Sequence, residues 1–452
     1  MGNVVFNKLV NTPLSKLEIK DGSNIAVIGG GPAGSFFAYF ALDFARLLDL
    51  HINIDIFEAK SFGKPGPAGC NHCGGIISES LVQNLSTEGI LLPTTVVRRG
   101  IESYKIHLEV GSAVIETPVI EKRIASVFRG FGPKGSTDSN FESFDGFLNS
   151  ICKEKGINVI NDKVSKLERC EDGVTVKYSN TSERKYDLVV GSVGLNLNTL
   201  QLFKDINPKY IFPKTTKTFI SEFYMENSLI DKYFGNSMNV FLLNIPHLKF
   251  GALIPKSDYV TLVLLGDQIN KAVVDSFLEN ETVRNCFPES IDPKSLMHCQ
   301  CYPTINIQGA KSAFDDRIIL IGDSASSKLY KNGIGAAYIT SKAAARTAIF
   351  HGISKNDFEN YYDKTCKKLD HDNDIGKFIF GLTSFIQKSN ILKKGLYKTI
   401  LTEQRKTNKE RRLSSILWDT FTGSASYSDI LQRGLDPRVG ASFIWNTIKS
   451  IY

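Results

Sequence analysis

Short apolar runs divide the chain and predict the strands of a buried parallel sheet. Residues 25–28, 52–57 and 318–321 are rich in isoleucine, and such runs are typical of strands packed between layers of helices. Helical patterns dominated by small residues follow the first run over 33–47 and the third run up to about Phe350. The pattern predicts an α/β fold built around a Rossmann-like sheet.

Alternating apolar and polar positions predict a second, antiparallel sheet. Residues 97–119 alternate in strand fashion, and further strand-like segments lie at 218–225, 239–243, 251–255 and 259–266. Such a region is typical of a substrate-binding sheet inserted into a dinucleotide-binding fold. Helices are expected at 76–85, 144–155 and 270–278, and most of the chain after 357 is expected to be helical, with breaks at Gly423 and Gly434.

Gly29, Gly31 and Gly34 form a GxGxxG motif between the first strand and its helix. Glycine permits the tight turn, the approach of a pyrophosphate and close packing of the helix on the strand. The helix presents free N–H groups and the positive end of its dipole to the phosphates. Glu58 ends the second strand, roughly 20 residues on, where an acid accepts hydrogen bonds from a ribose. Because an acid there disfavours a 2′-phosphate, the motif indicates FAD or NAD and not NADP.

A second strand, turn and helix pattern lies at 317–342. Its strand delivers Gly322 and Asp323, and Gly333 and Gly335 open the next helix. An aspartate at this place can hydrogen-bond a ribityl hydroxyl, and the helix N-terminus can present N–H groups to the pyrimidine edge of a flavin. Two helix N-termini directed at one extended dinucleotide favour FAD over NAD.

The loop at 60–75 is rich in glycine and proline and carries Cys70, His72 and Cys73. It is half of a metal site, a redox dithiol, or a loop that holds one thiol over a reacting substrate. A second pair, Cys299 and Cys301, leaves a four-cysteine zinc or iron–sulfur site open, although CxC is a less usual companion spacing. We expect no metal.

Composition limits the class of protein. The chain has 452 residues, 42% hydrophobic and 22% charged, as in ordinary globular proteins of about two or three domains. No apolar stretch reaches the ~18 residues of a membrane-spanning helix. Residues 1–23 lack the apolar segment of a signal peptide, so a cytoplasmic location is expected. The eight cysteines then favour thiols, metal ligands or catalysis over structural disulfides.

The net charge of +7 is modest, but one basic segment stands out. Its members are Lys388, Lys393, Lys394, Lys398, Arg405, Lys406, Lys409, Arg411 and Arg412. This segment is either a solvated helix face or a contact for anionic lipid head groups, and without a nucleic-acid motif we expect no nucleic-acid partner. The same region has an apolar stripe, which is either core and lid packing or a membrane-facing surface: Tyr361, Tyr362, Phe378, Phe380, Phe385 and Ile391.

Three motifs together resemble the geranylgeranyl reductase family, within the flavoprotein fold shared with aromatic hydroxylases. They are NIAVIGGGPAG with Glu58, the Cys73-Gly74-Gly75 loop, and RIILIGDSASS with its GIGAA helix. The resemblance spans about residues 22 to 350. It implies an enzyme that saturates C=C bonds of isoprenoid chains with hydride from reduced FAD, and it implies that Cys73 lies beside flavin and substrate. A thiol there can donate the proton, whereas the alternative for Cys73 is simple packing as a small hydrophobe.

The motifs and the resemblance together give a set of expected site residues. Those expected to bind the cofactor are Gly29, Gly31, Pro32, Ala33, Gly34, Glu58, Ala59, Cys73, Gly74, Gly322, Asp323, Gly333, Gly335 and Ala336. The family has a PxxYxWxFP segment over its substrate, and this chain has Phe250 and Ala252 at the Tyr and Trp positions. These two residues are expected to contact a substrate in a pocket of altered shape, and Arg129 and Lys134 to bind an anionic head group.

We therefore expect an FAD-dependent reductase acting on a hydrophobic, isoprenoid or lipid-linked substrate, with ferredoxin or NAD(P)H as electron donor and a membrane surface as a further contact. The alternatives are a flavin-dependent monooxygenase acting on an aromatic or lipid metabolite, a thiol or metal electron-transfer protein, and a catalytically silent FAD scaffold. The FAD-binding domain is expected at 1–95, 136–205 and 304–355. Substrate-domain strands are expected at 96–135, a substrate-binding antiparallel-sheet domain at 206–303, and a C-terminal helical region at 356–452.

Overall fold

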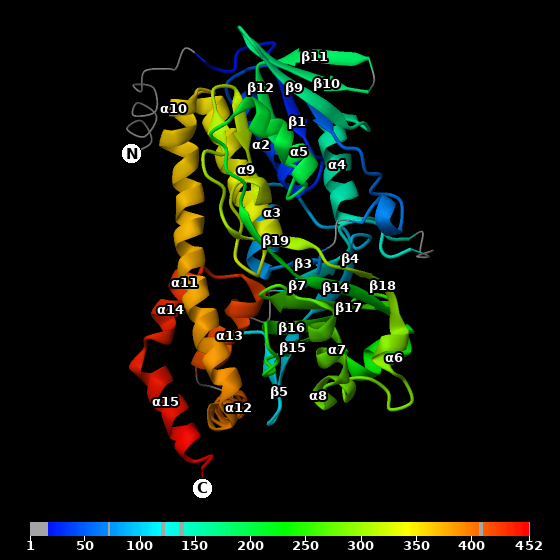
Figure 1. Cartoon of the computed structure of the whole chain (residues 1–452). Helices are drawn as coiled ribbons and strands as arrows, with labels where there is room; N and C mark the ends of the chain where they lie inside the picture. Colours follow the sequence, from blue (N-terminus) through cyan, green and yellow to red (C-terminus); the bar gives the residue numbers. More distant parts are fainter. Residues whose placement is uncertain are drawn as a thin grey trace.

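The computed structural model describes residues 17–70, 73–118, 123–134, 140–179, 181–405 and 410–451. His72 of the cysteine loop, and Lys406 and Lys409 of the basic segment, lie outside the described residues. Figure 1 shows a strand-and-helix layer at the top, a second sheet below it, and a helical region along one side.

The upper layer is a six-stranded sheet in the order β20-β21-β12-β1-β2-β8. Its strands are parallel except for β20, which pairs antiparallel with β21. The bounds are β1 Asn24–Ile28, β2 Asn53–Phe57, β8 Asn158–Ile160, β12 Leu188–Gly191, β20 Phe314–Asp315 and β21 Ile318–Leu320. The α/β fold predicted from the apolar runs is confirmed.

Four helices bury their apolar faces in one core with this sheet. They are α2 Pro32–Arg46, α4 Phe144–Glu154, α5 Leu197–Ile206 and α9 Gly333–Phe350. The small residues of α2 and α9 let these helices lie close together, and the Ser341 hydroxyl donates a hydrogen bond to the Ala33 carbonyl at 2.7 Å. A three-stranded ribbon flanks the layer, formed by β9 Val164–Cys170, β10 Gly173–Tyr178 and β11 Ser182–Tyr186.

The second sheet has seven strands in the order β18-β14-β17-β16-β15-β5-β6. Their bounds are β5 Ser103–Leu108, β6 Gly111–Glu116, β14 Phe219–Tyr224, β15 Ser237–Phe241, β16 Leu248–Pro255, β17 Tyr259–Gly266 and β18 Met297–Cys301. The expected antiparallel arrangement holds except where β5 and β15 pair in parallel. One face of this sheet packs against α6 Asn227–Tyr233, α7 Lys271–Glu279 and α8 Glu281–Arg284.

Two small sheets lie between these layers. One joins β3 Ile76–Ile77, β7 Ile124–Val127 and β4 Val97–Ile101, and the other joins β13 Lys214–Lys217 to β19 Thr304–Gln308. The helix expected at 76–85 is only partly right, because Ile76 and Ile77 pair with β7. Helix α3 Glu79–Thr87 begins after Ser78, whose hydroxyl caps it by accepting from the Leu81 N–H.

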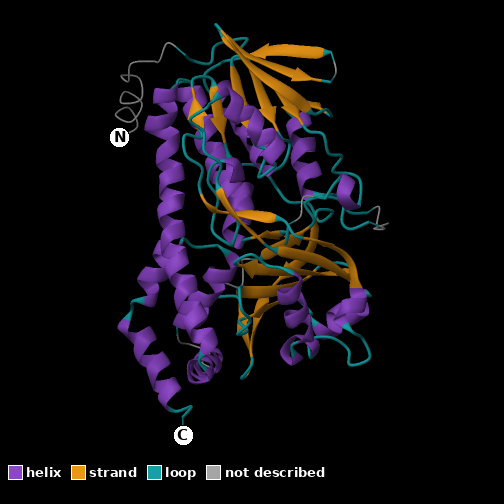
Figure 2. Ribbon diagram, in the orientation of Figure 1, coloured by secondary structure: helices purple, strands orange, loops and turns teal. Residues whose placement is uncertain are grey.

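The C-terminal region is helical and covers the other face of the seven-stranded sheet, as Figure 2 shows. It contains α10 Lys355–Asp357, the π-turn η4 Phe358–Tyr362, α11 Asp363–Lys388, α12 Asn390–Gln404, α13 Arg412–Thr422, α14 Tyr427–Gly434 and α15 Pro437–Ile448. The long helix α11 passes beside both sheets (Figure 1). None of the described helices combines the length and apolarity that crossing a bilayer requires.

Candidate active site

The turn from β1 to α2 has the backbone geometry that a GxGxxG motif requires. Gly29 has a φ of +103°, which favours glycine. A Cβ on Gly34 would lie 2.0 Å from the Gly29 carbonyl oxygen, so only glycine lets the helix approach the strand this closely. The Ser192 hydroxyl holds the turn from the neighbouring strand, by donating to the carbonyls of Ile28 at 2.9 Å and Gly29 at 2.7 Å.

Helix α2 offers an uncapped N-terminus to an anion. Gly31 is its N-cap residue, no side chain among the described residues caps it, and its first turn has no acid. The positive end of the helix dipole and the first N–H groups together suit a phosphate. These features fit the diphosphate of a dinucleotide.

Glu58 is held rigidly at the end of β2. One carboxylate oxygen accepts the Gly30 N–H and the other accepts the Lys60 N–H, each at 2.8 Å. Burial raises the pKa of this carboxyl, and the two backbone hydrogen bonds act in the opposite direction. Each carboxylate oxygen retains a lone pair that can accept from a hydroxyl donor. Glu58 also lines a cavity of about 380 Å³, whose walls include Phe62, Phe147 and Asn149. This arrangement fits a ribose.

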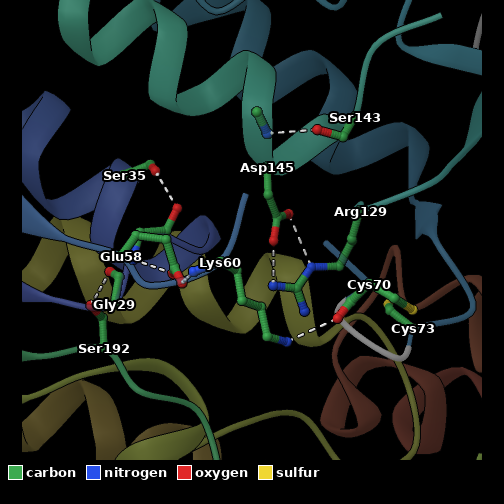
Figure 3. A network of polar contacts seen from close by, with 12 residues as sticks. Gly29, Ser35, Glu58, Lys60, Cys70, Cys73, Arg129, Ser143, Asp145 and Ser192 are labelled. Carbon is green, nitrogen blue, oxygen red and sulfur yellow. Dashed lines mark hydrogen bonds and ion pairs between the residues drawn. The ribbon is translucent and has the colours of Figure 1, made fainter. Parts of the chain in front are cut away.

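Arg129 lies beside this phosphate-binding turn and not on the sheet that carries Phe250. Its guanidinium donates two hydrogen bonds to the buried carboxylate of Asp145, from Nε at 3.0 Å and from Nη2 at 2.8 Å (Figure 3). Nη2 would be 3.2 Å from a Cβ on Gly31. Lys134, the second cation expected at a substrate head group, is exposed, and its backbone packs on Gly66.

The Cys73-Gly74-Gly75 loop packs directly on the seven-stranded sheet. A Cβ on Gly74 would lie 3.0 Å from Val263 and 3.4 Å from Ile254. Gly75 has a φ of +70°, and its carbonyl accepts the Val127 N–H at 2.7 Å. The Gly75 N–H points at the Cys73 sulfur, 3.3 Å away. The loop therefore holds the Cys73 thiol between the two layers of the molecule, close to Arg129 (Figure 3).

The second strand, turn and helix pattern also forms, with one difference from the prediction. Gly322 and Asp323 follow β21 in the short turn η3 Gly322–Ser324, and burial raises the Asp323 pKa while Ser327 and Arg129 oppose the rise. The N-terminus of α9 is already capped, because the Asn332 side chain accepts the Gly335 N–H at 2.8 Å. The Gly335 N–H is therefore used within the chain, and the expected role of Gly335 in the cofactor site stays a prediction.

The expected substrate residues Phe250 and Ala252 are buried between the second sheet and the C-terminal helices. They are 5% and 4% exposed. The Phe250 ring stacks on Phe380 of α11, with ring centroids 5.9 Å apart, and contacts Phe421 of α13 edge to face. Both residues lie on the same face of β16 as Ile254, which contacts the cysteine loop. The helical region therefore closes one end of this apolar face.

The cysteines are thiols in this structure. Cys70, Cys73, Cys299 and Cys301 are partly exposed and are not joined in disulfides, and burial raises the pKa of Cys299 to about 11 and of Cys301 to about 12. Among the described residues, which leave out His72, no group of three or more potential ligands is arranged for a metal.

Several polar residues of the site were not singled out from the sequence. Asp145, Ser192, Glu222, Lys256 and Asn332 all contact the predicted motifs or their neighbours. The role of Asn332 could have been predicted, because an asparagine just before the start of a helix is a preferred N-cap residue. Glu222 and Lys256 had none, because strand pairing alone brings them together.

Comparison with solved structures defines the class of fold. No family model matches the sequence, and no curated protein matches it significantly. The chain has the fold of FAD-dependent oxidoreductases, which confirms the expected FAD-binding fold. One similar structure is a geranylgeranyl bacteriochlorophyll reductase-like protein from Thermoplasma acidophilum, at a TM-score of 0.64 and 14% identity over 95% of this chain and 100% of that chain.

Two further similar structures belong to other reaction classes. The p-nitrophenol 4-monooxygenase PnpA from Pseudomonas putida has a TM-score of 0.56 and 13% identity over 89% of this chain and 98% of that chain. The halogenase PltM, solved with phloroglucinol and FAD, has a TM-score of 0.56 and 11% identity over 88% of this chain and 83% of that chain. These likenesses show the fold that the chain shares with solved flavoproteins and leave its reaction open.

Proposed function

We propose that this protein is an FAD-dependent reductase that saturates C=C bonds of a hydrophobic, isoprenoid or lipid-linked substrate. One observation carries the proposal. The loop with Cys73 lies against the apolar side chains of Ile254 and Val263. Arg129 lies close to this loop, to the phosphate-binding turn and to Asp323. A thiol that meets an apolar surface beside a flavin site suits proton delivery to an unactivated carbon.

The chain's own residues fit the parts of FAD. The start of α2 with Gly31 would hold the diphosphate, with Arg129 adding a positive charge, and Glu58 would hold the ribose. Asp323 would accept a hydrogen bond from the ribityl chain. When bound and reduced, FAD supplies hydride to one carbon of the double bond. Cys73 then gives its proton to the other carbon, and the apolar face with Ile254 and Val263 excludes water from the reacting chain.

An anaerobic experiment tests the reaction. The purified FAD-loaded protein is reduced, prenyl lipids are added, and flavin reoxidation is followed together with the lipid masses. We expect reoxidation and a gain of one hydrogen pair per bond, lost in Cys73→Ser and kept in Cys170→Ser, since Cys170 is exposed. Failure of every polyprenyl substrate to reoxidise the flavin would overturn the reductase proposal. Oxygen-dependent turnover stimulated by an aromatic metabolite would favour the monooxygenase instead. Ferredoxin and NAD(P)H are compared as donors in the same assay.

We also propose that the C-terminal helices contact an anionic membrane surface, where a lipid-linked substrate would be found. Phe378, Leu382 and Phe385 are exposed at successive turns of α11, and Ile444, Trp445 and Ile448 are exposed on α15. Exposed lysines accompany them, namely Lys377, Lys388, Lys394 and Lys449. Other members of the basic segment are used internally, since Lys393 pairs with Glu109 and Arg411 with Glu116, each at 2.8 Å. Apolar side chains with flanking lysines suit an interfacial contact.

A further inference from the structure

The amine of Lys256 is buried without a hydrogen-bond partner. Its side chain is 0% exposed, and Nζ makes no hydrogen bond to a described residue. Nζ lies 3.7 Å from the Glu222 carboxylate and 4.0 Å from the centre of the Phe128 ring. The Glu222 carboxylate and the Phe128 ring offset part of the cost of burying this charge.

Lys256 is directed at the cysteine loop. A Cβ on Gly75 would lie 3.2 Å from Nζ, and the N–H of the same Gly75 contacts the Cys73 sulfur at 3.3 Å. The amine and the thiol therefore lie on either side of one glycine. A side chain at this glycine would lie against the amine, and it would also clash with the Val127 carbonyl at 1.9 Å.

The charged and titratable groups around Lys256 come from four other elements. Glu222 faces it from β14, Arg98 from β4, Cys299 from β18, and Cys73 and Cys70 from the loop. Thr261 donates a hydrogen bond to the Glu222 carboxylate at 2.7 Å and so fixes its direction. Burial lowers the pKa of Lys256, and the Glu222 charge opposes that change. The ammonium is thus a readier proton donor than a lysine in water.

We propose that Lys256 acts through Cys73, as the cation that stabilises its thiolate and the donor that returns a proton to its sulfur. The inference rests on the proposed reduction. In that reaction a hydride, carrying both electrons, passes from reduced FAD to one carbon of the double bond, and the Cys73 S–H bond breaks as its proton forms a C–H bond at the other carbon. The thiolate then takes a proton from the Lys256 ammonium, and the neutral amine regains one from solvent. The external donor restores the flavin electrons.

Thiol reactivity tests the pair without reference to turnover. In a Cys70→Ser background, the full-length protein as purified is treated with iodoacetamide near neutral pH, and alkylation of Cys73 is followed by peptide mass spectrometry. Because only the thiolate reacts, we expect Lys256→Met to slow alkylation of Cys73 about tenfold. Lys249→Met, on strand β16 just before Lys256 and paired with Asp267, is expected to leave the rate unchanged.

Two further variants keep the outcome decisive. Lys256→Met strands the Glu222 carboxylate, so the double variant Lys256→Met/Glu222→Gln removes both charges and is expected to fold with the same slow alkylation. Lys256→Arg keeps the positive charge but does not release a proton. The Cys73 thiol of this variant is expected to be alkylated as quickly as in the parent, while the substrate-dependent rate falls.

The possible failures can be told apart. The rate of Cys73 alkylation could stay within about twofold of the parent rate in folded Lys256→Met or in the double variant. That result would overturn the proposed coupling of Lys256 to Cys73, whatever substrate the enzyme reduces. A clearly slower alkylation of Cys73 in these variants, together with no reduction of any prenyl substrate by the parent, would support the Lys256–Cys73 coupling. The same result would contradict the proposed reductase reaction.

Discussion

Arg129 and Asp145 form a two-point ion pair between the loop that follows β7 and the first turn of α4. Both carboxylate oxygens accept from the guanidinium, and the Asp145 side chain is 0% exposed. The pair fixes Arg129 beside Gly31, where a positive charge would face the cofactor phosphates.

Replacement of Arg129 by methionine is expected to reduce the free energy of unfolding by about 3–5 kcal/mol, because a buried carboxylate loses its guanidinium partner. Urea denaturation monitored by circular dichroism measures this change. Arg123→Met is the matched control, since its ion pair with Glu102 is about half exposed and is worth about 0–1 kcal/mol. Equal losses in the two variants would contradict a structural role for the buried pair.

Gly34→Ala is expected to prevent close packing of α2 on β1. The added Cβ would lie 2.0 Å from the Gly29 carbonyl oxygen and 2.7 Å from the Ser192 hydroxyl, so the phosphate-binding turn must move. We expect a loss of at least about 2 kcal/mol of stability and loss of flavin absorbance from the purified protein. Gly381→Ala on α11 has open space around its Cβ and should retain both properties.

Glu58→Gln is expected to weaken FAD binding about tenfold to a hundredfold. The amide places an NH₂ group where the Gly30 or Lys60 N–H now donates, and hydrogen bonds to charged groups are worth about 1.5–3 kcal/mol. Flavin fluorescence during titration of the apoprotein gives the dissociation constant. Glu183→Gln, an exposed carboxylate, should bind FAD as the parent does. Unchanged affinity in Glu58→Gln would remove Glu58 from the cofactor site.

The sequence predicted those parts of the site that depend on local backbone chemistry. Gly29 has a left-handed φ and a Cβ on Gly34 would meet the Gly29 carbonyl, so the turn itself requires both glycines, and Glu58 follows from the end of an apolar strand. The helix that begins at Phe144 was predicted from its pattern, but the ion pair of Asp145 was not, because Arg129 lies in a loop with no pattern of its own.

Contacts made between strands and between distant segments could not be predicted. Lys256 meets Glu222 because β14 and β16 both pair with β17, and the parallel pairing of β5 with β15 joins segments more than a hundred residues apart. The expected substrate residues Phe250 and Ala252 were found from a motif. Their burial depends on helices α11 and α13, and the sequence does not show which strand these helices pack against.

Lys331 is expected to make stability depend on pH. Burial lowers its pKa to about 7, although its amine donates to the carbonyls of Asp419 and Ala425. Between this value and the ordinary value of 10.5, the unfolded chain binds more protons than the folded one, so its contribution to stability rises with pH across that window. Compared with Lys331→Met, the parent should gain about 2 kcal/mol between about pH 7 and about pH 9. Urea denaturation at both pH values decides this, and a constant difference between parent and variant would contradict it.

Membrane contact is expected to depend on both charge and exposed aromatic side chains. The protein should sediment with vesicles that contain anionic lipid and not with neutral vesicles, and salt should weaken the binding. Phe385→Ser/Trp445→Ser should reduce binding about tenfold or more, because each aromatic side chain is more than half exposed and contributes buried apolar area at the interface. Leu47→Ser, an exposed leucine at the end of α2, is the control. If the double variant and the parent bind anionic vesicles equally well, the membrane contact does not involve Phe385 and Trp445.

Asn332 joins three segments that are remote along the chain, because its amide donates both to the Ser78 hydroxyl before α3, at 3.2 Å, and to the Gly423 carbonyl after α13, at 3.0 Å. Contacts of such long sequence separation form late, since chain closure must precede them. The segment before α3, the start of α9 and the end of α13 should therefore reach their final arrangement late in folding. Asn332 would then be held in place only after the C-terminal helices have been synthesised and have docked.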